Sequence, residues 1–312
     1  MKVKALAVGN TQVENNIFLA PMAGYTDYAF RRLAIKLGAG LTFTELVSAK
    51  GLMYGGEGSK ELLFSGNDYD KTAVQLFGSD SYFMRAACES EHLSKFSIVD
   101  INMGCPVPKV FKNGEGSALL TDIKKAENII KECVKSGKII TVKIRTGQKV
   151  GDDIATDYAM MAENSGASLI TIHGRVREAY YSGEVDYNAI ARAKRAVKIP
   201  VIANGGIFNK IDADIMLERT GADGIMLARG GIANPFLFSA LLDKESDLTL
   251  KEFIIEHLTI AASRYGDKRA ALEFRKFTPY YFKGMVGVKE LKNSINQADS
   301  TAEIIDLINT SL

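Results

Sequence analysis

Short apolar runs rich in β-branched residues recur along the chain as far as residue 227, and stretches with a helical spacing of apolar residues separate them. Such runs, bounded by turn residues, are typical of strands that are buried on both faces of a parallel sheet. Eight runs predict strands, at residues 17–20, 41–44, 73–77, 98–101, 139–144, 169–172, 201–203 and 224–227. The first three quarters of the chain are therefore expected to alternate between strands and helices.

The segments between these strands carry apolar residues three and four positions apart, as amphipathic helices do. The clearest predicted helices span residues 81–93, 123–134, 154–165, 187–197 and 210–219. Thr121-Asp122 and Gly151-Asp152-Asp153 supply side chains that typically cap a first helical turn. Eight strands that alternate with helices indicate the α/β class and, within it, a parallel (β/α)8 TIM barrel.

The pattern changes near Leu241, because only helical spacing follows from Thr249 onward. Helices are predicted at residues 250–265, 268–283, 288–296 and 302–309, after a polar linker at 243–247. Helices of this length pack their apolar faces together as a small bundle. We therefore expect two domains, a barrel over residues 1–242 and a small all-helical C-terminal domain over 243–312.

Net charge, cysteine content and the absence of long apolar segments indicate which partners and which cellular compartment to expect. The net charge of the 312 residues is +2, so any contact with nucleic acid must be a local patch. Three cysteines, far apart and odd in number, predict no disulfide framework and no metal site. The sequence shows no signal-peptide pattern and no apolar run of the roughly 18 residues that a membrane span needs. These features favour a cytoplasmic protein with no membrane partner.

Polar or small residues follow almost every predicted strand. In a (β/α)8 barrel the C-terminal strand ends meet at the face that carries the active site. Those ends hold Pro21-Met22-Ala23-Gly24, Glu45, Gln75, Asn102 with Cys105, Lys143 with Arg145, His173 with Arg175, Asn204-Gly205-Gly206 and Ala228-Arg229-Gly230. A barrel that served only as a scaffold would not need this convergence, so the pattern indicates an active site.

Cys105 stands on the turn after the fourth predicted strand, in the motif Asn-Met-Gly-Cys-Pro at 102–106. Free cysteines are often buried, so a packed loop thiol is the alternative. The flanking Asn102, Gly104 and Pro106 favour a functional thiol. Cys88 and Cys133 lie in helical patterns and are interpreted as packing residues.

Small-residue turns follow the last two predicted strands. Loops at these positions form the usual phosphate site of the fold, where backbone N–H groups bind the anion. Lys143 and Gln75 could then hold the polar end of a flat heterocycle, because a cation near N1 and O2 of a flavin stabilises the charge that develops on reduction. FMN, with one phosphate and one ring system, fits this arrangement.

These motifs resemble those of the tRNA-dihydrouridine synthases, flavin enzymes that reduce uridine in tRNA, and the B-type bacterial subfamily is the closest in pattern. The resemblance runs from about residue 16 to residue 240 and rests on the motifs at 20–27, 75–78, 102–106, 143–145, 173–175, 204–207 and 229–230. The chain departs from the family at Gly206, where an acidic residue is common, at Ala228, where glycine is common, and at Phe277, where histidine is more usual.

The resemblance implies a mechanism. NADPH, or NADH, would reduce FMN, reduced FMN would deliver hydride to C6 of a flipped-out uridine, and Cys105 would protonate C5 as general acid. An acid of this kind should have no depressed pKa. The implied cofactor contacts are Pro21, Met22, Ala23, Gln75, Lys143, His173, Asn204, Gly205, Gly206, Ala228 and Arg229. The implied substrate or RNA contacts are Asn102, Arg145, Arg175, Arg275 and Lys276.

The tail between residues 264 and 292 combines eight Lys or Arg with three acids and six aromatic residues. On composition alone, this segment is best interpreted as an amphipathic helix with an ordinary solvated face. If the neighbouring barrel reduces uridine in tRNA, RNA binding becomes the favoured interpretation. His92 and His257 are expected to be exposed, and Glu45 is either a structural or a pocket carboxylate. We expect a monomer that binds tRNA. The alternatives are an FMN-dependent reductase or dehydrogenase of small pyrimidines and a non-catalytic RNA-binding barrel.

Overall fold

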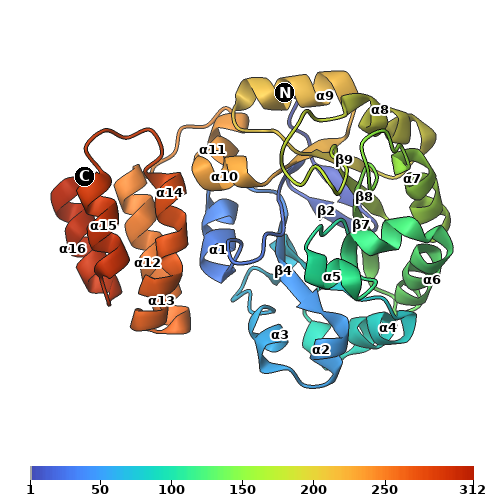
Figure 1. Cartoon of the computed structure of the whole chain (residues 1–312), viewed down its shortest axis with the longest axis horizontal. Helices are drawn as coiled ribbons and strands as arrows, with labels where there is room; N and C mark the ends of the chain where they lie inside the picture. Colours follow the sequence, from blue (N-terminus) through green and yellow to red (C-terminus); the bar gives the residue numbers. More distant parts are fainter. Residues whose placement is uncertain (1) are drawn as a thin grey trace.

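Eight parallel strands form one sheet in the computed structural model, which describes residues 2–312 (Figure 1). In spatial order the strands are β3 (Ile17–Leu19), β10 (Gly224–Leu227), β9 (Val201–Asn204), β8 (Leu169–His173), β7 (Ile139–Arg145), β6 (Ile98–Met103), β5 (Thr72–Phe77) and β4 (Thr42–Ser48). A parallel bridge between Phe18 and Leu41 joins the two edges of the sheet. The predicted TIM barrel is therefore confirmed.

Helices surround the barrel and cover the outward faces of its strands (Figure 1). The five clearest predictions correspond to α4 (Ser81–Glu89), α6 (Ile123–Val134), α7 (Ala155–Asn164), α8 (Tyr187–Ala196) and α9 (Lys210–Thr220). The remaining barrel helices are α1 (Tyr28–Lys36), α2 (Ala49–Met53), α3 (Glu57–Glu61), α5 (Pro108–Lys112), α10 (Arg229–Ala233) and α11 (Leu237–Leu241). No helix within residues 2–312 is both long enough and apolar enough to cross a membrane.

Only one of the two predicted helix caps is present. The Asp122 carboxylate accepts the N–H of Lys125 at 3.0 Å and caps α6. The cap expected at Asp152 and Asp153 is wrong, because α7 begins after Ile154, whose side chain cannot cap a helix. Asp152 instead accepts the N–H of Gln148 at 2.9 Å and so closes the loop before α7.

An N-terminal hairpin that the sequence pattern did not predict closes one end of the barrel. It consists of β1 (Leu6–Val8) and β2 (Thr11–Val13), which pair antiparallel. The turn at Gly9, which has φ +59°, lies against Ile139 at the start of β7. Apolar side chains of both hairpin strands join the cluster inside the N-terminal end of the barrel. The opposite end, where the strands terminate, is the one that stays open.

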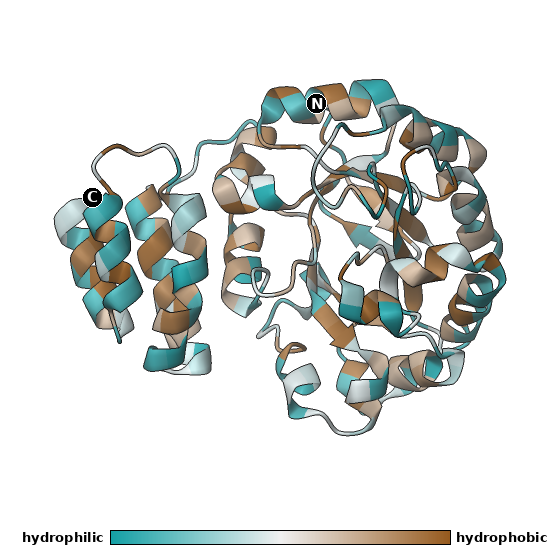
Figure 2. Cartoon of the chain, viewed as in Figure 1, coloured by the Kyte–Doolittle hydropathy of each residue, from teal (hydrophilic) through white to brown (hydrophobic). Residues whose placement is uncertain are grey.

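The C-terminal helices extend the apolar core of the barrel rather than standing apart from it. They are α12 (Leu250–Tyr265), α13 (Asp267–Phe274), α14 (Thr278–Tyr281), α15 (Lys289–Gln297) and α16 (Thr301–Ser311). Phe30 of α1 stacks on Phe277 with ring centroids 5.9 Å apart, and one apolar cluster spans both regions. Figure 2 shows apolar residues between the helices of each region. The division into two domains at residue 242 remains a prediction.

His257 is buried, so its expected exposure is wrong. Its ring lies 4.6 Å from that of Phe277, and its Nδ1 is 2.9 Å from the Tyr281 hydroxyl. Burial lowers the pKa of His257 to about 4, so the imidazole is neutral at physiological pH. The apolar face of α12 is turned toward α1 and α14, and the histidine packs there as an aromatic ring.

Candidate active site

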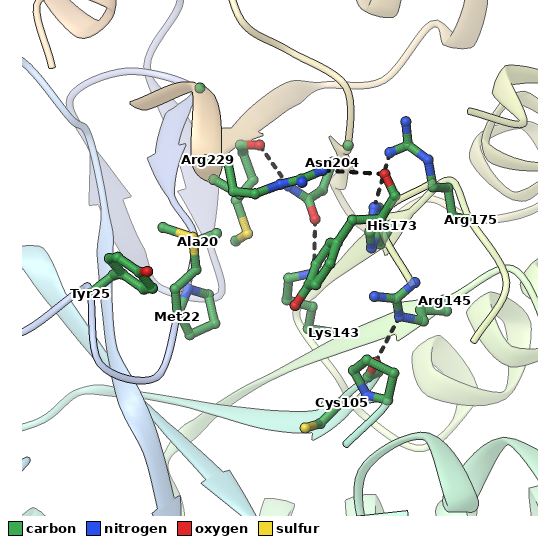
Figure 3. A pocket seen from close by; sticks show the side chains of 18 of the residues that line it. Ala20, Met22, Tyr25, Cys105, Lys143, Arg145, His173, Arg175, Asn204 and Arg229 are labelled. Carbon is green, nitrogen blue, oxygen red and sulfur yellow. Dashed lines mark hydrogen bonds between the residues drawn. The ribbon is translucent and has the colours of Figure 1, made fainter. Parts of the chain in front are cut away.

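A pocket of about 350 Å³ opens at the C-terminal ends of the barrel strands (Figure 3). In the close view, Met22 and Tyr25 form one wall, Cys105 lies at the lower edge, and His173, Arg175 and Arg229 lie around the far side. The residues predicted from sequence that line it are Pro21, Met22, Ala23, Asn102, Cys105, Lys143, Arg145, His173, Arg175, Asn204, Gly205, Gly206, Ala228 and Arg229. The ends of β3 and of β6 to β10 therefore meet at one pocket, whereas the predicted strand-end residues Glu45 and Gln75 do not line it.

Three predicted site residues lie outside this pocket. Gln75 is fully buried beneath it. Arg275 donates to the Ala298 carbonyl at 2.9 Å in the helical tail. Lys276 pairs with Glu273 on the same helical surface. The RNA contacts proposed for Arg275 and Lys276 therefore remain predictions about the surface of the helical tail.

Glu45 and Lys276 meet in a second, smaller cavity of about 160 Å³ between β4 and the tail. The Glu45 carboxylate accepts the backbone N–H of Gly24, and burial raises its pKa. Arg31 is almost fully buried beside it and donates to the Thr26 carbonyl at 2.8 Å. Glu45 thus holds the loop after β3 in place and does not face the main pocket.

Aromatic side chains complete the main pocket, and sequence reasoning did not select them as site residues. Tyr25, Tyr181, Phe208 and Tyr280 all line it. Tyr280 comes from α14, and its ring centroid lies 5.5 Å from that of Tyr25. The helical tail therefore forms part of the pocket wall. The aromatic residues of the tail were the sequence feature that could have indicated a role for Tyr280. Where the tail lies relative to the barrel, however, depends on tertiary packing.

Cys105 stands on a loop that is fixed from two sides. The Asn102 Oδ1 accepts the N–H of Cys105 at 2.9 Å and that of Gly104 at 3.2 Å. The Ser117 hydroxyl donates to the Cys105 carbonyl at 2.7 Å. Arg145 donates from Nε to the Gly104 carbonyl at 2.9 Å. These bonds hold the backbone of the thiol while its side chain remains free to face the pocket.

A chain of hydrogen bonds under the pocket sets the orientation of Asn102. The Asp100 carboxylate accepts Nε2 of Gln75 at 2.6 Å, and Gln75 Oε1 accepts Nδ2 of Asn102 at 2.8 Å. An ionised carboxylate can only accept hydrogen bonds, so the amide nitrogen of Gln75 must face Asp100. The amide oxygen of Gln75 then faces the amide nitrogen of Asn102. Burial raises the pKa of Asp100 to about 6, which leaves the group ionised at neutral pH. Gln75 therefore acts on the site through Asn102.

Burial raises the pKa of the Cys105 thiol above its ordinary value, and this effect outweighs the N–H of Val107 and the charge of Arg145, which both lower it. A nucleophilic cysteine would require the opposite shift, because the thiolate is its reactive form. A thiol that keeps its proton at neutral pH suits proton donation. The expectation that Cys105 has no depressed pKa is confirmed.

The raised pKa predicts the pH dependence of any step in which Cys105 gives up a proton. Only the protonated thiol can donate. The rate should therefore stay constant through neutral pH and fall only above pH 9, because the pKa of Cys105 in the folded chain is higher than the ordinary thiol value of 9.0. Rapid-mixing measurement of substrate reduction between about pH 6 and pH 10.5 would test this. An alkaline fall centred near neutral pH would contradict the assignment.

Positive charge dominates the main pocket. Lys143, Arg145, Arg175 and Arg229 line it, whereas none of its described lining residues is Asp or Glu. Burial, reinforced by these four cations, lowers the pKa of His173 well below its ordinary value, so this histidine is neutral. Such a cavity favours an anionic ligand, because no described carboxylate lines it to balance these cations.

Lys143 lies at the base of this positive region. Its Nζ donates to Asn204 Oδ1 at 3.0 Å, and Asn204 donates from Nδ2 to the Met226 carbonyl at 2.8 Å (Figure 3). Burial and the nearby Arg145 lower the pKa of Lys143 to about 7, while Asp100 opposes the shift. A ligand atom that carries negative charge here would restore the ammonium form.

The turns after β9 and β10 leave space for an anion next to the backbone. Gly205 and Gly206 have φ of +113° and +71°, values that favour glycine. A Cβ on Gly205 would lie 2.6 Å from the ring of His173, and one on Gly230 would lie 1.9 Å from the Ile207 carbonyl oxygen. Only glycine fits these positions, so the two turns can approach each other and a phosphate closely.

The Gly230→Ala variant should lose affinity for a phosphate-bearing ligand. The added methyl group must displace the Ile207 carbonyl, which forces the turns after β9 and β10 apart. We expect at least about a tenfold weaker complex and a lower melting temperature, as overpacking costs about 1–3 kcal/mol. Fluorescence titration with FMN would measure the affinity. Gly58→Ala is the matched control, because its methyl group would meet no described atom within 4 Å beyond its own helix backbone and chain neighbours.

Comparison with known proteins gives a consistent result across nearly the whole chain. Residues 18–311 match the family model described as dihydrouridine synthase. The tRNA-dihydrouridine synthase B of Pasteurella multocida is 37% identical over 290 residues, which cover 90% of this chain and 87% of that protein. A probable tRNA-dihydrouridine synthase of Rickettsia bellii is 34% identical, over 97% of this chain and 96% of that protein.

Solved structures share the fold at low sequence identity. A variant of NCR from Zymomonas mobilis superposes with a TM-score of 0.56 at 17% identity, over 86% of this chain and 99% of that one. A 2-naphthoyl-CoA reductase gives a TM-score of 0.61 at 12% identity, over 77% of this chain and 52% of that one. These similarities support the barrel architecture.

Proposed function

The chain belongs to the dihydrouridine synthase family, and from this premise we propose that its barrel holds FMN, uses NADPH as the electron source and donates a proton from Cys105. Its activity is that of a flavin-dependent oxidoreductase that reduces uridine in tRNA. The observation that carries the proposal is one pocket that contains the Cys105 thiol, Lys143 and the two glycine turns.

The pocket fits FMN in both charge and shape. Gly205, Gly206 and Gly230 would bind its phosphate, since a side chain at Gly205 would meet His173 and one at Gly230 would meet the Ile207 backbone. Arg175 and Arg229 lie beside these turns and add positive charge. Lys143 would face the N1 and O2 edge of the ring, where its charge favours the reduced form.

Bound FMN, once reduced, would supply hydride to C6 of the uracil ring. Cys105 would hold the proton at Sγ and transfer it to C5, so that the C5–C6 double bond gains two hydrogens. Arg145 lies close enough for its charge to lower the pKa of Cys105, so it would also stabilise the thiolate that remains. Asn102 has a second Nδ2 hydrogen beyond the one that Gln75 accepts, and this hydrogen could bind the uracil edge.

The two alternative functions are disfavoured. A reductase of small free pyrimidines needs no docking unit, yet Tyr280 of the helical tail forms part of the pocket wall. A non-catalytic scaffold would not need a protonated thiol held by Asn102 and Ser117 at the strand ends. The pocket therefore agrees with an enzyme whose substrate is large enough to contact both barrel and tail.

The test is anaerobic incubation of the purified protein with NADPH and tRNA that lacks dihydrouridine, followed by nucleoside mass spectrometry. We expect uridine to gain two hydrogens, FMN to be released on denaturation, and NADH to serve less well than NADPH. A yellow protein that NADPH bleaches but that converts only free pyrimidines would overturn the tRNA assignment. A colourless protein that binds tRNA without converting it would support the scaffold alternative.

A further inference from the structure

Two tyrosines stand largely in solvent on the catalytic end of the barrel. Tyr54 and Tyr82 are each 72% exposed, although large aromatic side chains usually bury most of their surface. Phe83 lies between them, with ring centroids 5.5 Å from Tyr54 and 5.4 Å from Tyr82. We call this set, together with Lys50, the aromatic rim.

The topology places the aromatic rim beside the mouth of the pocket. Lys50 belongs to α2, which begins directly after the C-terminal end of β4, and Tyr54 follows the end of α2. Tyr82 is in the first turn of α4, which follows the C-terminal end of β5. The two helices pack against each other, so the residues of the rim form one surface.

The charge of the rim acts on the loop that carries Cys105. Lys50 Nζ lies 5.7 Å from the centroid of Phe83, and its charge also acts on Glu115. The residue after Glu115 is Gly116, where a Cβ would lie 3.0 Å from the Cβ of Cys105. A polymer whose reacting unit lies at Cys105 would therefore reach the rim with its neighbouring units.

Resting on the proposed function, we propose that the aromatic rim binds unpaired bases of the tRNA that flank the target uridine, by stacking them on Tyr54 and Tyr82. Exposed aromatic faces beside a cation are the features that bind single-stranded RNA, since every base offers a π-face and every linkage a negative phosphate. Lys50 supplies the positive charge, and Lys125, which also acts on Glu115, extends it. The rim lies on the barrel and so adds a contact separate from the basic tail.

Substitution of both tyrosines should raise the KM for tRNA while kcat stays close to its normal value. Because each tyrosine would lose a stacked base, Tyr54→Ala with Tyr82→Ala should cost at least about tenfold in kcat/KM. Tyr54→Phe with Tyr82→Phe keeps the rings and should retain most of the affinity. An unchanged KM in the alanine pair, or an equal loss in the phenylalanine pair, would overturn the stacking proposal.

A direct readout is available because the chain contains no tryptophan. Tyr82→Trp places a single indole on the rim, and its emission should be quenched when tRNA binds. Gln12→Trp, in β2 at the closed end of the barrel, is the control and should not respond. Lack of quenching in Tyr82→Trp at saturating tRNA would overturn the inference. Conversion of uridine by the unsubstituted chain tests the proposed function alone, so the two failures are distinguishable.

Discussion

Replacement of Cys105 with alanine is expected to slow the reduction of uridine in tRNA by about 10²- to 10⁴-fold, the usual contribution of a positioned general acid. Burial keeps this thiol protonated at neutral pH, since its pKa lies above the ordinary value. Without it, C5 of the uracil ring must take its proton from water. Single-turnover mixing of prereduced enzyme with tRNA would measure this step directly.

The same variant should leave reduction of the flavin by NADPH unchanged, because no proton from Cys105 is needed there. Cys105→Ser provides the matched variant, since it keeps the size and the loop but offers a much weaker acid. Its rate should fall between those of the alanine variant and the unsubstituted chain. A Cys105→Ala enzyme that converts tRNA at the normal rate would contradict the role of this residue.

Replacement of Lys143 with methionine should have the second largest effect, on flavin reduction. Methionine keeps the length of the side chain and removes its charge. Loss of a preorganised electrostatic partner typically costs about 10²- to 10³-fold in rate. We therefore expect slower bleaching by NADPH and a more negative flavin potential, measured by dye-coupled titration. Lys138→Met is the control, because Lys138 donates at 2.6 Å to the Phe96 carbonyl outside the pocket.

Lys143 should also affect stability in a predictable direction. Its pKa is about 7 in the folded chain and 10.5 when unperturbed, so between these values the unfolded chain binds more protons. The contribution of Lys143 to the free energy of unfolding of the cofactor-free protein should therefore increase as pH rises from about 7 to 10.5. Denaturant titrations at several pH values should show a smaller gain for Lys143→Met. An equal gain would show that the lysine is not buried as described.

The barrel could be predicted from sequence because its strands are buried on both faces. Such strands give continuous apolar runs, and the end of each run marks the residue that faces the pocket, as at Lys143 and Asn204. The hairpin of β1 and β2 was missed because each strand has only three residues, too few for the alternation of apolar and polar residues there to indicate a strand pair. His257 was misplaced because helical spacing alone does not reveal what packs against α12.

The candidate site could be predicted only as far as its residues follow the strand ends. The cofactor contact of Gln75 stays a prediction, and its side chain in β5 is bonded to Asp100 and Asn102 beneath the pocket. Tyr280 was not predicted to line the pocket, because its place there depends on how the tail packs against the barrel. Its contact with Tyr25 joins two distant parts of the sequence, and no local pattern encodes such a separation.

The hairpin that closes the barrel has a practical consequence for handling the molecule. Its turn at Gly9 lies against Ile139, at the start of β7 and therefore far from the thiol loop at the other end of the strands. A sensor surface or bead attached through the first residues would leave the mouth and the aromatic rim pointing outward. Attachment through Leu312 would instead anchor the helices whose Tyr280 lines the mouth. Immobilised measurements of RNA binding should therefore use the amino-terminal end.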